Sequence, residues 1–290
     1  YIVFGAESPK CILIDHRAMT TRASAFASGL GLNARTKMLQ YAPYTSDMFL
    51  QEVFGTFLCG GSICIPSDED LADLSKTIKT MQANCVSITP STAMTLRSAE
   101  DLGIEVLALW GEHPTKQLLT ALPGGIQVHA FYGTPECSSS CIRSPQLDGL
   151  CESSIIGSSI GCKSWLVDPS DHDILVPIGC VGELMIEGPS LSHGYYQDAE
   201  LTQQYFVENP MWRLAYESQP PSDKDKNTDA QKLSYRLFKT GDLARYNSDG
   251  TLVYVGKKDR ALHWQRQTAA IYVEEQIASL SSFNVQYVVE

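Results

Sequence analysis

The chain has 290 residues, 43% hydrophobic and 19% charged, an ordinary globular composition with enough apolar material for a sizeable core. Its net charge of −11 argues against nucleic acid as a main partner, because binding to a phosphate backbone requires a basic surface. The sequence contains no recognisable signal peptide and no apolar run long enough to cross a bilayer, so no membrane partner is expected.

Nine cysteines are scattered along the chain without a C-x-x-C pair. An odd number in a long chain favours free thiols in a reducing compartment over a disulfide framework or a zinc site. We therefore expect a cytoplasmic location. The first residues, YIVF, form an apolar run without an initiator methionine, which indicates a piece of a longer protein.

The first half of the chain alternates between short apolar strands and helices. Strands are predicted at residues 1–4, 11–14, 38–42, 63–65, 85–88, 104–109 and 126–131. Helices are predicted at 16–30, 68–83 and 115–122, with a partly helical spacing at 47–58 and a short helix opened by Ser91 after Pro90. This alternation predicts an α/β fold over residues 1–149, with a parallel sheet and right-handed crossover helices.

The clearest predicted helix is the one at 68–83. Ser67 is placed to cap it, three acidic residues at 68–70 lie at its positive end, and apolar residues recur with helical spacing from Leu71 to Met81.

The pattern changes after residue 149. Strands expected at 164–167, 182–187, 237–239 and 252–255 have little helix between them, which predicts a smaller β-rich unit over residues 150–255. Within it, the polar stretch 217–232 is expected to form a mobile surface insertion. Residues 256–290 begin with a hinge-like basic run and continue with an expected helix at 274–280 and a strand at 285–289.

The segment FYGTPEC, residues 131–137, is the first candidate for a functional site. An apolar run breaks at Gly133, Thr134 and Pro135 signal a turn, and Glu136 follows as an isolated carboxylate among small polar residues. Open α/β sheets place their sites at the carboxyl ends of strands. The alternative is an ordinary surface loop.

Several segments, taken in order, resemble the motifs of adenylate-forming enzymes: YIVF, PK, IDH, the segment around Asp47, FYGTPEC, GELMIEG, HGYY, FKTGDL and GKKD. The resemblance covers essentially the whole chain and looks closest to the adenylation domains of fungal-type nonribosomal peptide synthetases. It implies that residues 1–255 are most of the large subdomain and that 256–290 are the hinge and the incomplete start of the small C-terminal subdomain.

The implied activity is ATP-dependent activation of an amino acid as an acyl-adenylate, followed by transfer to the thiol of a carrier protein. The implied partners are the carrier (thiolation) and condensation domains of the same synthetase. A nicotinamide-type oxidoreductase is excluded, because no G-x-G-x-x-G follows any predicted strand.

The resemblance assigns roles in ATP binding. Asp242 would accept hydrogen bonds from the ribose hydroxyls, although it could instead cap a turn, and Tyr132 would stack on adenine or be a core aromatic. Lys10 and Glu136 would be catalytic, with Glu136 holding Mg²⁺ on the phosphates, because a hard cation prefers oxygen ligands. The same comparison adds Gly133, Thr134 and Lys257 to the nucleotide-binding set.

Asp47 would pair with the α-ammonium of the amino acid, and an isolated acid in an apolar stretch has few structural explanations. The positions that match the family's specificity pocket are Met48, Gln51, Ser87, Ala108, Trp110, Phe131, Ser139 and Ser140. Trp110 and Phe131 would narrow this pocket, while Gln51 and the serines would add polarity, although Trp110 suits a core position nearly as well.

Some motifs depart from the family. Relatives carry a TSGSTGxPKG loop, whereas residues 5–8 here are GAES, a shorter loop whose Glu7 disfavours bound phosphates. Pro135 and His193 replace a threonine and an arginine, and Lys257 replaces an arginine and loses its fork of donors. The bridging lysine of the small subdomain would lie beyond Glu290. These departures predict impaired activity and support a second hypothesis, a degenerate adenylation domain acting as a structural and interaction scaffold within a multidomain synthetase.

Overall fold

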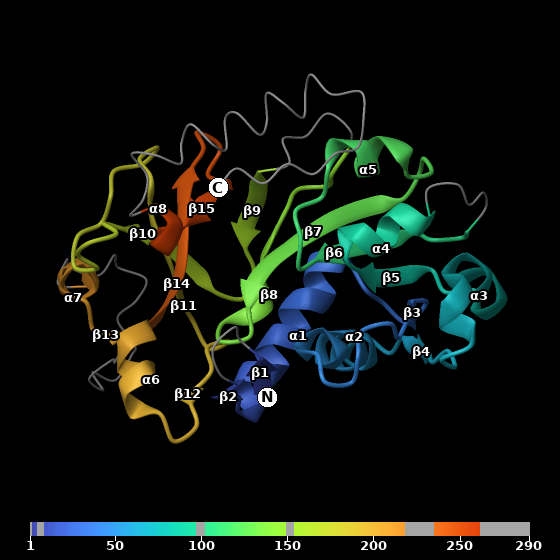
Figure 1. Cartoon of the computed structure of the whole chain (residues 1–290), viewed down its shortest axis with the longest axis horizontal. Helices are drawn as coiled ribbons and strands as arrows, with labels where there is room; N and C mark the ends of the chain where they lie inside the picture. Colours follow the sequence, from blue (N-terminus) through green and yellow to red (C-terminus); the bar gives the residue numbers. More distant parts are fainter. Residues whose placement is uncertain (1, 5–8, 97–101, 149–153, 218–234, 262–290) are drawn as a thin grey trace, which may run out of the picture.

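A computed structural model describes residues 2–4, 9–96, 102–148, 154–217 and 235–261. The expected α/β class is confirmed, and most strands belong to one twelve-stranded mixed sheet of order β10-β11-β14-β15-β9-β8-β7-β6-β5-β3-β4, with β13 beside β14 (Figure 1). A separate three-stranded sheet contains β1 (Ile2–Phe4), β2 (Pro9–Leu13) and β12 (Gly194–Tyr195).

One half of the large sheet is parallel. Its strands are β3 (Lys37–Leu39), β4 (Ser62–Cys64), β5 (Cys85–Ile88), β6 (Val106–Trp110) and β7 (Gln127–Thr134). These five strands hydrogen-bond to one another in parallel, and β7 pairs with β8 in antiparallel fashion on its other side. Every residue of β5 is buried, as expected for a strand covered on both faces.

Helices cover both faces of the parallel half (Figure 1). One face packs against α1 (His16–Leu30) and α2 (Asp47–Leu58). The other packs against α3 (Leu74–Met81), α4 (Pro90–Ala93), η2 (Met94–Leu96) and α5 (Lys116–Ala121). The predicted spans 16–30 and 47–58 match α1 and α2, which are capped by the side chains of Asp15 and Ser46.

Two predicted helix starts are wrong. The expected helix at 68–83 is a short 3₁₀ helix, η1 (Asp70–Asp73), followed by α3, because Asp73 caps α3 by accepting from the Lys76 amide. Ser67 accepts from the Asp70 amide at 3.2 Å and donates to the Asp70 carboxylate, so it binds the start of the short η1 rather than capping one long helix. Helix α4 is capped by Thr89 rather than opened by Ser91, with Pro90 in its first turn.

The other half of the large sheet is antiparallel. Its strands are β8 (Ser138–Arg143), β9 (Ile155–Ser159), β10 (Lys163–Val167), β11 (Gly182–Glu187), β13 (Phe206–Glu208), β14 (Arg236–Tyr246) and β15 (Leu252–Lys257). The expected β-rich segment is therefore present, and pairing through β8 and β9 joins it to the parallel half.

Three short helices accompany these strands: α6 (Ala199–Tyr205), α7 (Met211–Glu217) and α8 (Lys258–Ala261). Several predictions fall outside the described residues. These are the 5–8 loop, residues 218–232 of the expected insertion, and the helix and strand expected beyond residue 261. The proposed domain boundaries remain predictions.

Candidate functional site

The FYGTPEC segment forms the end of β7 and the turn into β8, at the carboxyl end of the parallel strands. Thr134 pairs with Ser138 across this hairpin. Gly133 is required here, because a Cβ atom would collide with the carbonyl of Ser138. The hairpin thus presents Tyr132 on one side of the turn and Glu136 within it.

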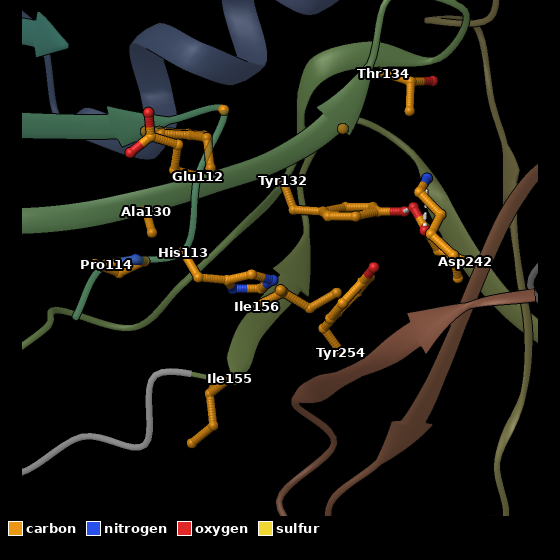
Figure 2. Close-up of a pocket in the computed structure, with 14 residues that line it drawn as sticks. Glu112, His113, Pro114, Ala130, Tyr132, Thr134, Ile155, Ile156, Asp242 and Tyr254 are labelled. Atoms are coloured by element: carbon orange, nitrogen blue, oxygen red, sulfur yellow. Dashed lines mark hydrogen bonds and ion pairs between the residues drawn. The ribbon is translucent and has the colours of Figure 1, made fainter. Parts of the chain in front are cut away.

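A pocket of about 280 Å³ opens beside β7 (Figure 2). The hydroxyl of Tyr132 donates to Asp242 Oδ2 at 2.6 Å, and Lys257 Nζ lies 2.7 Å from Asp242 Oδ1. The pocket is lined by Gly111, Glu112, His113, Pro114, Ala130, Phe131, Tyr132, Gly133, Thr134, Ile155, Ile156, Asp242, Tyr254 and Lys257. All five residues predicted to bind nucleotide therefore lie around one cavity.

Asp242 is 2% exposed and lies opposite Lys257 in the β14–β15 register. Burial, followed by the nearby Asp242 carboxylate, raises the pKa of Tyr132 well above its ordinary value, so the phenol stays protonated and remains a donor. A carboxylate offers about four acceptor positions, so Asp242 retains capacity for two further donors.

Sequence reasoning missed two aromatic walls of this pocket, His113 and Tyr254. Their rings contact each other with centroids 4.9 Å apart, and Figure 2 shows both below Tyr132. His113 follows β6 at the same sheet edge as Tyr132, and Tyr254 belongs to the strand that pairs with the TGD strand. The GEHP turn after a buried strand was the available signal.

Tyr195 connects the two predicted catalytic residues. Its hydroxyl donates to Glu136 Oε1 at 2.7 Å, and Lys10 Nζ lies 5.7 Å from the centroid of its ring. Burial and the adjacent Glu136 raise the pKa of Tyr195, which keeps its hydroxyl protonated. Lys10 and Glu136 thus occupy one neighbourhood on opposite sides of a tyrosine.

Asp47 is the first residue of α2 and is 6% exposed. It accepts a hydrogen bond from the Ser139 hydroxyl. Burial raises the pKa of Asp47, and Ser139 and Arg22 partly oppose that shift. The carboxylate is therefore buried, and the Ser139 hydroxyl, Arg22 and the backbone at residues 47 and 48 favour its charged form.

Arg22 is a buried cation near Asp47 that sequence reasoning did not single out. It is 1% exposed, and its Nε and Nη2 donate to the carbonyls of Ser190 at 2.8 Å and Glu136 at 3.3 Å. Ala18, Arg22 and Phe26 all face inward from α1. Their spacing of four residues was the signal that Arg22 lies on a buried stripe.

The predicted specificity residues also come together. Ser87 pairs with Ala108, and Trp110 with Phe131, on adjacent parallel strands. Ala108, Phe131 and Trp110 pack in the cluster that includes Met48 of α2. Six of the eight are buried, namely Met48, Gln51, Ser87, Ala108, Phe131 and Ser140; Trp110 and Ser139 are half-buried.

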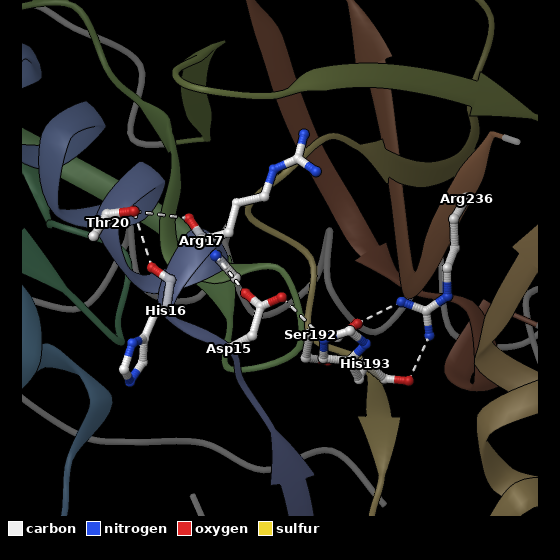
Figure 3. Close-up of polar contacts among 8 residues, drawn as sticks. Asp15, His16, Arg17, Thr20, Ser192, His193 and Arg236 are labelled. Carbon is white, nitrogen blue, oxygen red and sulfur yellow. Dashed lines mark hydrogen bonds and ion pairs between the residues drawn. The ribbon is translucent and has the colours of Figure 1, made fainter. Parts of the chain in front are cut away.

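His193, which replaces the family's arginine, is held on the surface (Figure 3). Its Nε2 lies 2.9 Å from Asp15 Oδ2, and Arg236 donates to the backbone carbonyls of Ser192 and His193. The pKa of Asp15 is lowered, mainly by the Ala18 amide and then by His193. This contact connects the IDH and HGYY segments.

Comparison with known proteins shows the family to which the chain belongs. Residues 8–196 match the family described as AMP-binding enzyme. The chain belongs to the AMP-binding enzyme family. It is 45% identical over 280 residues to nonribosomal peptide synthetase 1 of Aspergillus fumigatus, a match that covers 95% of this chain and 4% of that protein. The resemblance to fungal nonribosomal peptide synthetases is thereby confirmed.

Solved structures share the fold of this AMP-binding chain. The N-terminal subdomain of Klebsiella oxytoca NpsA, in complex with 3-hydroxyanthranilyl-AMSN, has a TM-score of 0.70 at 19% identity, over 88% of this chain and 63% of that one. Holo-PA1221, a protein containing adenylation and PCP domains, has a TM-score of 0.71 at 24% identity, over 89% of this chain and 44% of that one.

Two further observations bear on the expectations from sequence. None of the helices among the described residues is long and apolar enough to span a membrane. All eight cysteines in the described part of the chain are free thiols, as the sequence predicted.

Proposed function

We propose that this chain activates an amino acid with ATP, forming an acyl-adenylate that is loaded onto a carrier protein in nonribosomal peptide synthesis. The observation that carries this proposal is the pocket in which Tyr132, Asp242 and Lys257 converge from β7, β14 and β15. An aromatic face beside a buried carboxylate with spare acceptor positions suits adenine linked to ribose.

Within this pocket, the ribose hydroxyls would donate to Asp242 while Lys257 balances its charge. The rings of Tyr132 and Tyr254 would bound the base. Asp47 would accept the α-ammonium of the amino acid, with Ser139 fixing the orientation of its carboxylate. These residues position a carboxylate to attack the α-phosphate, which is mainly a matter of orientation and electrostatics.

Glu136 fits a role toward Mg²⁺. Its Oε1 accepts from Tyr195, and no hydrogen bond to its Oε2 is found among the described residues, so one hard oxygen remains available as a ligand. Mg²⁺ is commonly held by one or two carboxylates together with substrate phosphates, and the described residues contain no larger group of ligands that could hold it. When bound, the ion would neutralise phosphate charge during adenylation.

We infer that the rate is low, because the GAES sequence offers fewer glycines and hydroxyls than the family's phosphate loop and adds the acidic residue Glu7. Pro135 also removes a hydroxyl next to Glu136. The carrier and condensation domains of the same synthetase are the proposed partners. This part of the proposal is based on the similarity to a synthetase in which the matched region is 4% of the full length.

The experiment is amino-acid-dependent ATP–pyrophosphate exchange, combined with calorimetric titration of MgATP and of AMP. We expect AMP and ATP to bind with similar affinity, because the adenosine contacts are present and the phosphate contacts are reduced. Slow exchange above the level without amino acid is the expected catalytic result. Nucleotide binding without exchange for any amino acid would contradict catalysis.

The second candidate is a scaffold that keeps the fold and has lost the reaction. The GAES sequence and Pro135 favour it, since both depart from the motifs by which the family contacts phosphates. A scaffold needs no nucleotide, so silence in both titrations and in the exchange assay would support it and refute the enzyme.

A further inference from the structure

Three buried polar side-chain atoms near the amino-acid site have no hydrogen-bond partner among the described residues. They are Gln51 Oε1, Ser87 Oγ and Trp110 Nε1. Gln51 is 1% exposed and Ser87 is fully buried. Buried polar atoms in folded proteins are nearly always paired, so a group of them in one region indicates a bound ligand.

These atoms share one face of the sheet. Ser87 lies beside Ala108 in the β5–β6 register, and Trp110 is two residues further along β6, so it projects to the same side. Helix α2 covers that side, and residues 47 and 51 are one helical turn apart on it. The polar atoms therefore flank the position that Asp47 assigns to the amino acid.

The neighbouring Glu52 is already satisfied. Its carboxylate accepts from the amides of Tyr41 at 3.2 Å and Ala42 at 3.2 Å. The Ser87 hydroxyl also stabilises the charged form of Glu52, which gives Ser87 an interaction of its own. Gln51 and Trp110 consequently carry most of the inference, and Ser87 adds a hydroxyl that can donate or accept.

Gln51 Oε1 and Trp110 Nε1 require different hydrogen-bond partners, a donor for the first and an acceptor for the second. The Gln51 carbonyl oxygen only accepts, and the Trp110 N–H only donates. A hydrocarbon satisfies neither, an ammonium cannot accept, and a carboxylate cannot donate and would face the charge of Asp47. A hydroxyl or a primary carboxamide does both, and it also satisfies the Gln51 amide in either of its two orientations.

The available width is small. Phe131 lies beside Trp110, and its ring is packed against Phe26 with centroids 5.2 Å apart. Met48 is 1% exposed and belongs to the same cluster. Large side chains on three elements border this region, which favours a short substituent on the α-carbon.

We infer that the amino acid this site takes has a short, uncharged side chain that carries a hydroxyl or a carboxamide. The inference rests on the proposed function, because the ammonium on Asp47 sets the direction in which the side chain extends. Gln51 and Trp110 then act as specificity-determining residues.

The test compares aminoacyl-sulfamoyl adenosines, stable analogues of the acyl-adenylate, by calorimetric titration into the chain. Threonyl and valyl compounds differ by a hydroxyl in place of a methyl group, and asparaginyl and leucyl compounds differ by an amide in place of a branched hydrocarbon. We expect at least one polar member to bind about tenfold or more tightly than its apolar partner. The pair that shows the difference identifies hydroxyl or carboxamide.

Two variants connect that preference to named atoms. Gln51→Met removes the acceptor and Trp110→Phe removes the donor, and each should reduce the preferred pair's ratio to within about threefold. Gln117→Met, an exposed glutamine on α5, is the control and should leave the ratio unchanged. The affinity ratios of the wild-type chain are measured without any variant, so they test the inference even if a variant folds poorly.

Equal or tighter binding of both apolar analogues would overturn the inference, and so would a ratio that neither variant alters. Neither result would contradict the proposed function, because binding of the analogues would still show that the site accepts their adenosine group. If no analogue binds and AMP also fails to bind, the proposed function itself is refuted, and the inference falls with it.

Discussion

Replacing Asp242 with asparagine tests the nucleotide pocket most directly. The change keeps the shape of the side chain and removes the charge that Lys257 faces at 2.7 Å and that the ribose hydroxyls would use. Hydrogen bonds to charged groups contribute about 1.5–3 kcal/mol each, so losing one predicts about 10- to 150-fold weaker AMP binding.

The effect on folding should be small. The Lys257 side chain is 53% exposed and can turn to solvent, so it is not left as a buried charge when the Asp242 side chain, which is 3% exposed, becomes neutral. Titration calorimetry with AMP gives the affinity, and thermal denaturation gives the stability. Asp249→Asn, on the exposed turn of the same hairpin, is the matched control and should bind AMP normally. AMP affinity within about threefold of wild type in Asp242→Asn would refute the assignment of the pocket.

Three further predictions concern stability. Folding raises the pKa of Glu52 from 4.5 to about 8, so the native state loses stability as pH rises through that interval. The melting temperature should therefore vary less between pH 5 and 9 in Glu52→Gln than in the wild type. Parallel curves of melting temperature against pH would contradict this. Arg22→Met should lower the free energy of unfolding by about 2–4 kcal/mol in denaturant titrations, because two buried carbonyls lose a charged donor, whereas exposed Arg17→Met should have little effect. Gly133→Ala should destabilise the fold by at least about 2 kcal/mol, because the added Cβ atom collides with the Ser138 carbonyl. Gly124→Ala, whose Cβ atom would meet no atom within 4 Å, should be tolerated. Equal melting temperatures for the two variants would refute this reasoning.

The parallel half of the fold could be predicted from local pattern. Caps at Asp15 and Ser46 and the apolar run 85–88 are encoded within a few residues, and α1, α2 and β5 have the predicted bounds. The split at Asp73 was missed because acidic side chains suit both a helix start and a competing cap.

The site was predictable where a motif names its residue, as in TGD and FYGTPEC. The aromatic walls His113 and Tyr254 and the buried cation Arg22 were not, because their positions depend on which elements meet in space. No local pattern states that β15 lies against the end of β7, or that α1 faces the turn at Glu136. Such contacts arise from strand order, which a single sequence specifies only indirectly.

The residues that match the family's motifs and the residues that depart from them belong to chemically different parts of the proposed site. Contacts that suit adenosine and an ammonium group are held by buried side chains with defined partners, as Asp242 and Asp47 show. The altered residues depart from the family's motifs, and we expect these departures to reduce the stabilisation of phosphate charge. One of them, His193, directs its ring to Asp15. On the proposed function, we expect a site of this kind to bind both substrates and still react slowly, because orientation is kept while transition-state charge receives less stabilisation. Affinity and rate are therefore separate properties of this chain.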